Sequence, residues 1–206
     1  MGGGVLLWEF HNNRKGRTGL AVILFRNKFS GRFEDPGGAC DDEDGSLVTA
    51  QRELEEESLG LFVIHPQHFQ KKYSVQVKQY VAYNLFVRAE RGIDQRYYDQ
   101  NYRKLKEERR GVVPHCWRET NGFQRFYLED LINAGIWTAR SDFICPDSNG
   151  VVQMFQRRAI LVIQSTLDEK IVEPNGKISP PCLQLNLCQS RTNGPSFAQG
   201  TSCYFS

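Results

Sequence analysis

The chain has 206 residues, 40% of them hydrophobic and 12% aromatic, which is enough apolar material for one good core and favours a single domain over two. Its formal net charge of +2 excludes neither nucleic acids nor acidic small molecules as partners. No apolar run approaches the roughly 20 residues of a membrane-spanning helix, and the first residues are not typical of a signal peptide, so we expect an intracellular, cytoplasmic protein without membrane partners.

The hydrophobic pattern predicts strands early in the chain and helices late. Strands are predicted at residues 4–10 and 19–25, and the continuous apolar run from Leu20 to Phe25 is typical of a strand that is buried on both faces. Further elements follow in chain order: strands at 61–64 and 79–87, and helices at 126–134 and 151–169.

Two segments differ in composition from the rest. Residues 88–110 hold eight Lys or Arg and three Tyr without an apolar stripe, which predicts an exposed insertion with a short helix. Residues 174–206 contain no Asp or Glu and are rich in polar and turn-forming types, which predicts a polar, flexible C-terminal tail, although Leu183, Leu185 and Leu187 alternate like a strand. The main domain is therefore assigned to residues 1–173.

The most informative segment is acidic. Ten of the 24 Asp and Glu residues fall between Glu34 and Glu57, with only Arg52 as a cation among them. Such a charge density destabilises a fold unless a cation neutralises it. A helix is predicted at residues 47–58 with Ser46 as its N-cap.

This helix would have two different sides. The side predicted to face the sheet contains Leu47, Ala50, Gln51, Leu54 and Ser58. Glu53, Glu56 and Glu57 fall together on another side, at i, i+3 and i+4, and Arg52 lies four residues before Glu56, within reach of its carboxylate. Three carboxylates on one turn suit Mg²⁺ or Mn²⁺, which prefer oxygen ligands.

Two simpler interpretations compete with a metal site. The glutamates could form a solvated acidic face, which is the usual role of a charge run. A calcium loop is excluded because Cys40 and Gln51 occupy the first and twelfth ligand positions, where Asp and Glu are required. The glycine pair Gly37-Gly38 favours the metal site, because a tight turn there lets backbone carbonyls approach an ion.

The segment resembles the Nudix box, whose pattern is G, five residues, E, seven residues, R-E-U-x-E-E-x-G-U, where U is a bulky aliphatic residue. The matching residues are Gly38, Asp44, Arg52, Glu53, Leu54, Glu56 and Glu57, with both spacings intact. Asp44 replaces the first Glu of the pattern. Leu59 stands where Gly is expected and Gly60 follows one place late, so we expect the helix to run one residue longer.

The resemblance implies a Nudix-like α/β/α sandwich with a mixed central sheet. It also implies hydrolysis of the diphosphate linkage of a nucleoside diphosphate derivative by water attack on phosphorus, with Mg²⁺ or Mn²⁺ as cofactor. Glu56 and Glu57 would be the main metal ligands, assisted by the Gly38 carbonyl, and Glu53 a third ligand or the general base. Asp44 and Arg52 would support the box. An acidic residue from a later loop often contributes in the family; the candidates are Asp94, Asp99, Glu107 and Glu108.

The substrate is the least determined part of this interpretation. In the 88–110 segment, aromatic rings that could stack on a base and cations that could meet phosphates occur together: Arg96, Tyr97, Tyr98, Tyr102, Arg103 and Lys104. A nucleotide and the cap of messenger RNA both fit this chemistry, and a charged solvated loop is the simpler alternative. A Nudix-like module that binds a nucleotide or a protein partner without turnover is the remaining possibility.

Overall fold

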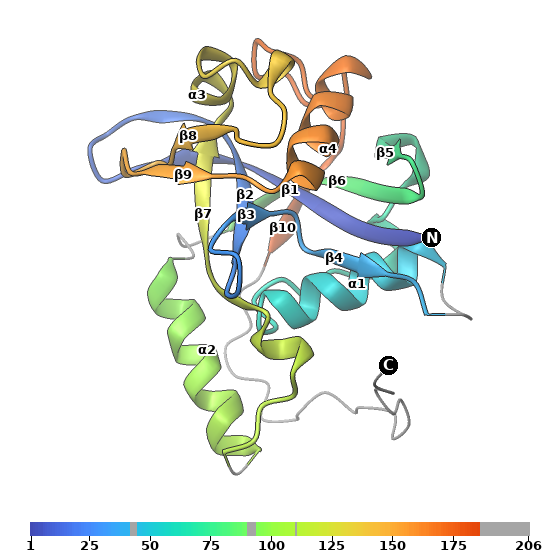
Figure 1. The fold of residues 1–206 in the computed structure, drawn as a ribbon, viewed down its shortest axis with the longest axis vertical. Helices are drawn as coiled ribbons and strands as arrows, with labels where there is room; N and C mark the ends of the chain where they lie inside the picture. The colour runs from blue at the N-terminus through green and yellow to red at the C-terminus, as the bar shows by residue number, and fades with distance from the viewer. Residues whose placement is uncertain (42–44, 90–93, 110, 186–206) are drawn as a thin grey trace.

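The computed structural model describes residues 1–41, 45–89, 94–109 and 111–185, and it shows a mixed sheet with helices on both faces (Figure 1). The main path of the sheet runs in the order β10 (Cys182–Leu185), β6 (Tyr80–Ala89), β1 (Gly2–Asn12), β2 (Thr18–Asn27) and β3 (Phe33–Glu34). Three further strands join it: β4 (Gly37–Ala39) pairs with β1, β5 (Ser74–Val77) with β6, and β7 (Thr120–Tyr127) with β2. Strand β6 is parallel to β1 and to β10, whereas the other pairs are antiparallel.

The helices form the two outer layers. Helices α1 (Ser46–Glu57) and α2 (Gln95–Glu108) lie on one face of the sheet, and α3 (Leu128–Asn133) and α4 (Arg157–Asp168) on the other (Figure 1). The remaining elements are the hairpin of β8 (Ile144–Pro146) and β9 (Val152–Met154), and the short 3₁₀ helices η1 (Pro66–His68), η2 (Lys71–Tyr73), η3 (Cys116–Arg118) and η4 (Ile136–Thr138). The predicted α/β/α arrangement with a mixed sheet is confirmed.

Each face of the sheet carries its own apolar core. Along β1, Leu6 and Trp8 pack toward α3 and α4, while Val5 and Leu7 pack toward α1. This alternation is the geometry of a strand that is buried on both faces, where successive side chains point to opposite sides. The run from Leu20 to Phe25 in β2 behaves in the same way, with every member at most 5% exposed, as its composition predicts.

Three predicted element boundaries are wrong. Residues 61–64 form a bend and coil and not a strand; their apolar character reflects Phe62 and Ile64, which are buried in the α1-side core. The predicted helix at 151–169 is two elements, β9 and α4, separated where Phe155 forms a bridge with Phe33. The predicted helix at 126–134 begins only after β7 ends at Tyr127.

The two segments of unusual composition are more ordered than predicted. Residues 88–110 contain a helix of 14 residues, α2, whose N-cap Asp94 accepts a hydrogen bond from the Arg96 backbone N–H. The tail adds β10 to the sheet beside β6, which agrees with the alternation predicted for Leu183, and residues 186–206 lie outside the described part of the chain. Within that part, no helix is both long and apolar enough to cross a membrane.

Candidate active site

Helix α1 carries the three glutamates against the edge of the sheet. Its buried side includes Ala50 and Leu54. Ser46 is the first helical residue and not the N-cap, which is Gly45; the Ser46 hydroxyl lies 3.2 Å from the Tyr83 hydroxyl. The helix ends at Glu57, so the predicted extension by one residue is wrong.

The residue that replaces the expected glycine takes over its backbone conformation. Leu59 has φ of 55°, in the left-handed region that favours glycine, and Gly60 follows with φ of 73°. Leu59 is only 2% exposed and belongs to the α1-side core. Burial of its side chain therefore offsets the backbone strain, which for a residue with a Cβ is about 1–2 kcal/mol.

The carboxylate of Glu57 is the most unusual group of this region. The residue is 4% exposed, and its Oε2 atom has no hydrogen-bond partner although it is fully buried. Burial raises the pKa of Glu57 well above its usual range, and the neighbouring carboxylates of Glu34 and Glu53 raise it further. A buried unsatisfied oxygen of this kind needs an explanation, and a bound ion or water would supply one.

Glu53 and Glu56 are less buried than Glu57 and are held by Arg52. Their side chains are 14% and 16% exposed, and the Arg52 guanidinium donates to Glu53 Oε1 over 3.0 Å and to Glu56 Oε2 over 3.4 Å. Burial is again the main cause that raises the pKa of both carboxyls, that of Glu56 to about 7. A third carboxylate, that of Asp41, lies 3.6 Å from Arg52.

Gly38 leaves space for the carboxylate of Glu53. Gly38 lies in β4, where it pairs with Gly3 of β1, and a Cβ on Gly38 would come within 2.3 Å of Glu53 Oε1. The carboxylate of Glu53 therefore occupies the space that a side chain at position 38 would fill. Asp44, the predicted supporting acid of the box, lies outside the described residues.

The cluster rests on an ion pair that the sequence did not reveal. Asp35 is completely buried and accepts hydrogen bonds from Arg158 Nε over 3.2 Å and from the Tyr80 hydroxyl over 2.6 Å. Arg158, from the start of α4, also donates to the Asp35 backbone carbonyl over 2.6 Å and lies 3.8 Å from Glu34 Oε2. Its positive charge lowers the pKa of Glu57, so Arg158 partly balances the negative charge of the acidic cluster.

The later acidic residue near the cluster is Glu119, which was not among the predicted candidates. It follows η3 and raises the pKa of both Glu53 and Glu56. In the same segment, Cys116 makes a side-chain hydrogen bond with Glu56.

Three of the four predicted candidates make local contacts within α2 instead. Asp94 pairs with Arg96, Asp99 accepts from Gln95, and Glu108 pairs with Lys104.

The residues present fit a divalent cation without forming a finished ligand set. Across the described residues, no three His, Cys, Asp or Glu side chains are grouped as metal ligands, and both Glu53 and Glu56 are turned toward Arg52. One observation nevertheless matches a cation, namely the unsatisfied Oε2 of Glu57. A set made only of carboxylates suits Mg²⁺ or Mn²⁺.

The predicted substrate-side residues of α2 divide into different environments. Tyr98 is 3% exposed and its hydroxyl lies 2.6 Å from the Thr120 hydroxyl, so its ring is not available for stacking. Arg96 pairs with Asp94 at the exposed start of the helix. Tyr97 is 37% exposed, Tyr102 is half-buried, and Arg103 is exposed.

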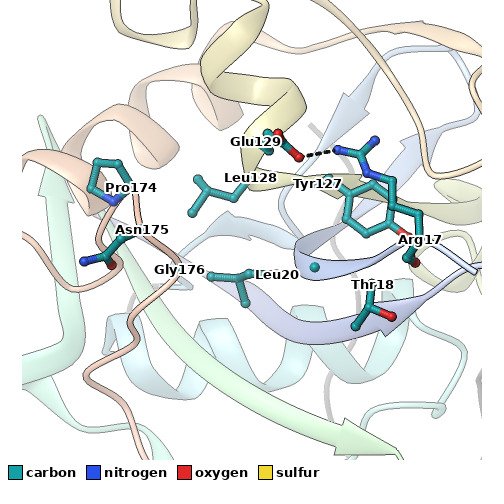
Figure 2. Close-up of a pocket in the computed structure, with 10 residues that line it drawn as sticks. Arg17, Thr18, Leu20, Tyr127, Leu128, Glu129, Pro174, Asn175 and Gly176 are labelled. Atoms are coloured by element: carbon teal, nitrogen blue, oxygen red, sulfur yellow. Dashed lines mark hydrogen bonds and ion pairs between the residues drawn. The ribbon is translucent and has the colours of Figure 1, made fainter.

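Two cavities lie outside the glutamate cluster. One, of about 140 Å³, lies between β2, the start of α3 and residues 174–176, where Arg17 is already paired with Glu129 and Asp130 (Figure 2). The other, of about 350 Å³, lies beside the C-terminal half of α2 and is lined by Tyr102, Lys106, Gly111, Val112, Val113 and Arg118.

Comparison with known proteins gave matches only among solved structures. No protein-family model and no curated protein sequence matches this chain. A MutT/nudix family protein from Enterococcus faecalis has a TM-score of 0.49 and 15% identity, with 84% of this chain and 64% of that protein covered. This chain thus spans less than two thirds of that protein's length. NrtR from Shewanella oneidensis has a TM-score of 0.39 and 17% identity, covering 86% and 69%. An Ap4A hydrolase from C. elegans has a TM-score of 0.33 and 14% identity, covering 65% and 84%.

Proposed function

We propose that this chain is a Nudix-type, metal-dependent hydrolase that cleaves the diphosphate linkage of a nucleoside diphosphate derivative. The observation that carries the proposal is Glu57, whose buried Oε2 lacks a partner and whose pKa is raised by the charges of two further glutamates, Glu34 and Glu53. The sequence around it matches the box pattern at both long spacings. A cluster of buried carboxylates without a cation destabilises the fold, and binding of a divalent cation would offset that cost.

We assign the roles of the residues from the box resemblance and from their positions. Glu53, Glu56 and Glu57, with the Gly38 carbonyl, would hold Mg²⁺ or Mn²⁺. When bound, such an ion supplies positive charge to the diphosphate oxygens and lowers the pKa of a bound water. Arg52 holds the carboxylates of Glu53 and Glu56 in place through its two hydrogen bonds.

Two groups at the border of the cluster have supporting roles. Arg158 partly balances the negative charge of Glu57 and donates a hydrogen bond to the backbone carbonyl of Asp35. Glu119 is 41% exposed at its side chain and lies close enough to influence Glu53 and Glu56. Its access to water fits a group that accepts the proton of the attacking water.

The test is product analysis with a panel of nucleotides in the presence of Mg²⁺ or Mn²⁺. The panel would contain ADP-ribose, dinucleoside polyphosphates, nucleotide sugars, coenzyme A, NADH and capped RNA. Wild type should release phosphate-containing products from at least one of them, and Glu57→Gln should reduce turnover by at least 100-fold while the circular dichroism spectrum is retained. Full activity in Glu57→Gln would show that the metal site is assigned to the wrong residues.

A module that binds a nucleotide without turnover is the second candidate. It is favoured by one observation: within the described part of the chain, the glutamates are not grouped as a ligand set. The same panel separates the two functions, because a binding module would retain nucleotide affinity without releasing product.

A further inference from the structure

The cavity beside α2 has the size and the charge of a nucleotide-binding pocket. Its volume of about 350 Å³ falls within the range of ligand pockets, which begins at about 300 Å³. Lys106 and Arg118 reach it from two different segments, α2 and η3. Both are exposed, and neither has an ion pair among the described residues, whereas Lys104 and Arg96 are paired. Two unpaired cations on one cavity favour an anion.

The same cavity offers a surface for a flat ring. Tyr102 lies one helical turn before Lys106, so both side chains are on the same side of α2. The Tyr102 ring is half-buried against the α1-side core, which fixes its position. Val112, 74% exposed, and the buried Val113 add apolar contact area. An aromatic ring beside two cations is the combination that binds a base together with a phosphate.

The 3₁₀ helix η3 and the residue that follows it lie near both this cavity and the glutamate cluster. Arg118 lines the cavity. Cys116, two residues earlier, makes a side-chain hydrogen bond with Glu56. Glu119, one residue after Arg118, raises the pKa of Glu53 and Glu56. Residues of this one segment therefore contact both the cavity and the glutamate cluster.

We infer that this cavity binds the part of a nucleotide substrate that lies beyond the diphosphate to be cleaved, with a phosphate between Lys106 and Arg118 and a base against Tyr102. The inference rests on the proposed function for the placement of the diphosphate. It differs from that function in one respect: the two cations bind phosphate directly, so binding here needs no divalent ion.

The experiment measures ADP binding to the full chain by isothermal titration calorimetry in EDTA at low salt. Wild type should bind ADP, and Lys106→Ala and Arg118→Ala should each weaken binding by about tenfold. Lys15→Ala removes an equal charge from the exposed turn between β1 and β2, which does not line the cavity, and it should change the affinity by less than twofold.

The ring contact is tested separately with Tyr102. Tyr102→Ala should weaken ADP binding about fivefold or more and leave the binding of inorganic pyrophosphate unchanged, whereas Tyr102→Phe should retain ADP affinity. Phe keeps the packing of the ring. A loss of fold in Tyr102→Ala would therefore appear as a difference between the circular dichroism spectra of Tyr102→Ala and Tyr102→Phe.

The outcomes for the cavity and for the enzyme are distinguishable. Absence of ADP binding to wild type in EDTA, or equal losses in Lys15→Ala and Lys106→Ala, would overturn the cavity whether or not hydrolysis is observed. Loss of ADP binding only in the cavity variants, in a protein that hydrolyses nothing, would support the cavity and count against the enzyme.

Discussion

Replacement of Arg158 by methionine removes a guanidinium from a buried carboxylate while it keeps a side chain of similar length. Asp35 has no exposure to water and, among the residues that the structure describes, would keep only the Tyr80 hydroxyl as a side-chain donor. Removing one partner of a buried ion pair costs about 3–5 kcal/mol. The Arg158 side chain is 31% exposed, which reduces the cost, so we expect a loss near 3 kcal/mol.

Urea unfolding measures this loss. With an m-value of about 2 kcal/mol per molar, the midpoint should fall by roughly 1.5 M. Arg157→Met is the matched control, because Arg157 is the preceding residue of α4 and is exposed; its midpoint should change by less than about 0.3 M. Asp35→Asn in the Arg158→Met background should recover part of the loss, since it removes the unpaired charge. Equal midpoints for the two arginine variants would refute the view that this pair anchors α4 to the loop before β4.

Three further results are expected. Glu56 takes up its proton at about pH 7 in the folded protein and at about 4.5 in a free side chain, so the folded state binds more protons between these values; the metal-free protein should lose about 2 kcal/mol of unfolding free energy from pH 5.5 to pH 8, and Glu56→Gln should lose less. A stability that rises over this pH range in EDTA would contradict the buried position of the carboxylate. Gly38→Ala should displace the Glu53 carboxylate, lowering Mn²⁺ affinity at least tenfold in an electron paramagnetic resonance titration while the melting temperature falls by less than about 4 °C, because the clash is with the end of a flexible side chain. Leu59→Gly should lower stability by about 1–3 kcal/mol in thermal unfolding, because the loss of a buried leucine exceeds the relief of its left-handed backbone; a more stable variant would show that the strain dominates.

Sequence periodicity was sufficient to predict those parts of the structure that depend on residues close together along the chain. Glu53, Glu56 and Glu57 lie on one helix because positions three and four apart share a face, whatever surrounds the helix. The doubly buried strand was predictable from its unbroken apolar run. The short run at 61–64 failed because four apolar residues fit a buried coil as well as a strand, and periodicity cannot distinguish them.

The surroundings of the glutamates depend on contacts that local patterns do not contain. Asp35 and Arg158 are 123 positions apart and meet only because α4 packs over the sheet. One signal was available: with ten acidic residues and a single arginine between positions 34 and 57, a second cation had to come from elsewhere in the chain. The sequence contains too many lysines and arginines for charge alone to identify Arg158 as that cation.

The position of β1 in the middle of the sheet has a consequence for how the protein assembles. This strand pairs on one edge with β2, which follows it directly in the chain. Its other long edge can pair only after β6 has been synthesised, because Gly2 of β1 lies opposite Tyr80 of β6. Parallel pairing across such a separation raises the contact order, and a higher contact order slows folding. On the ribosome, the nascent chain would therefore expose one edge of its central strand until the middle third of the polypeptide has been synthesised.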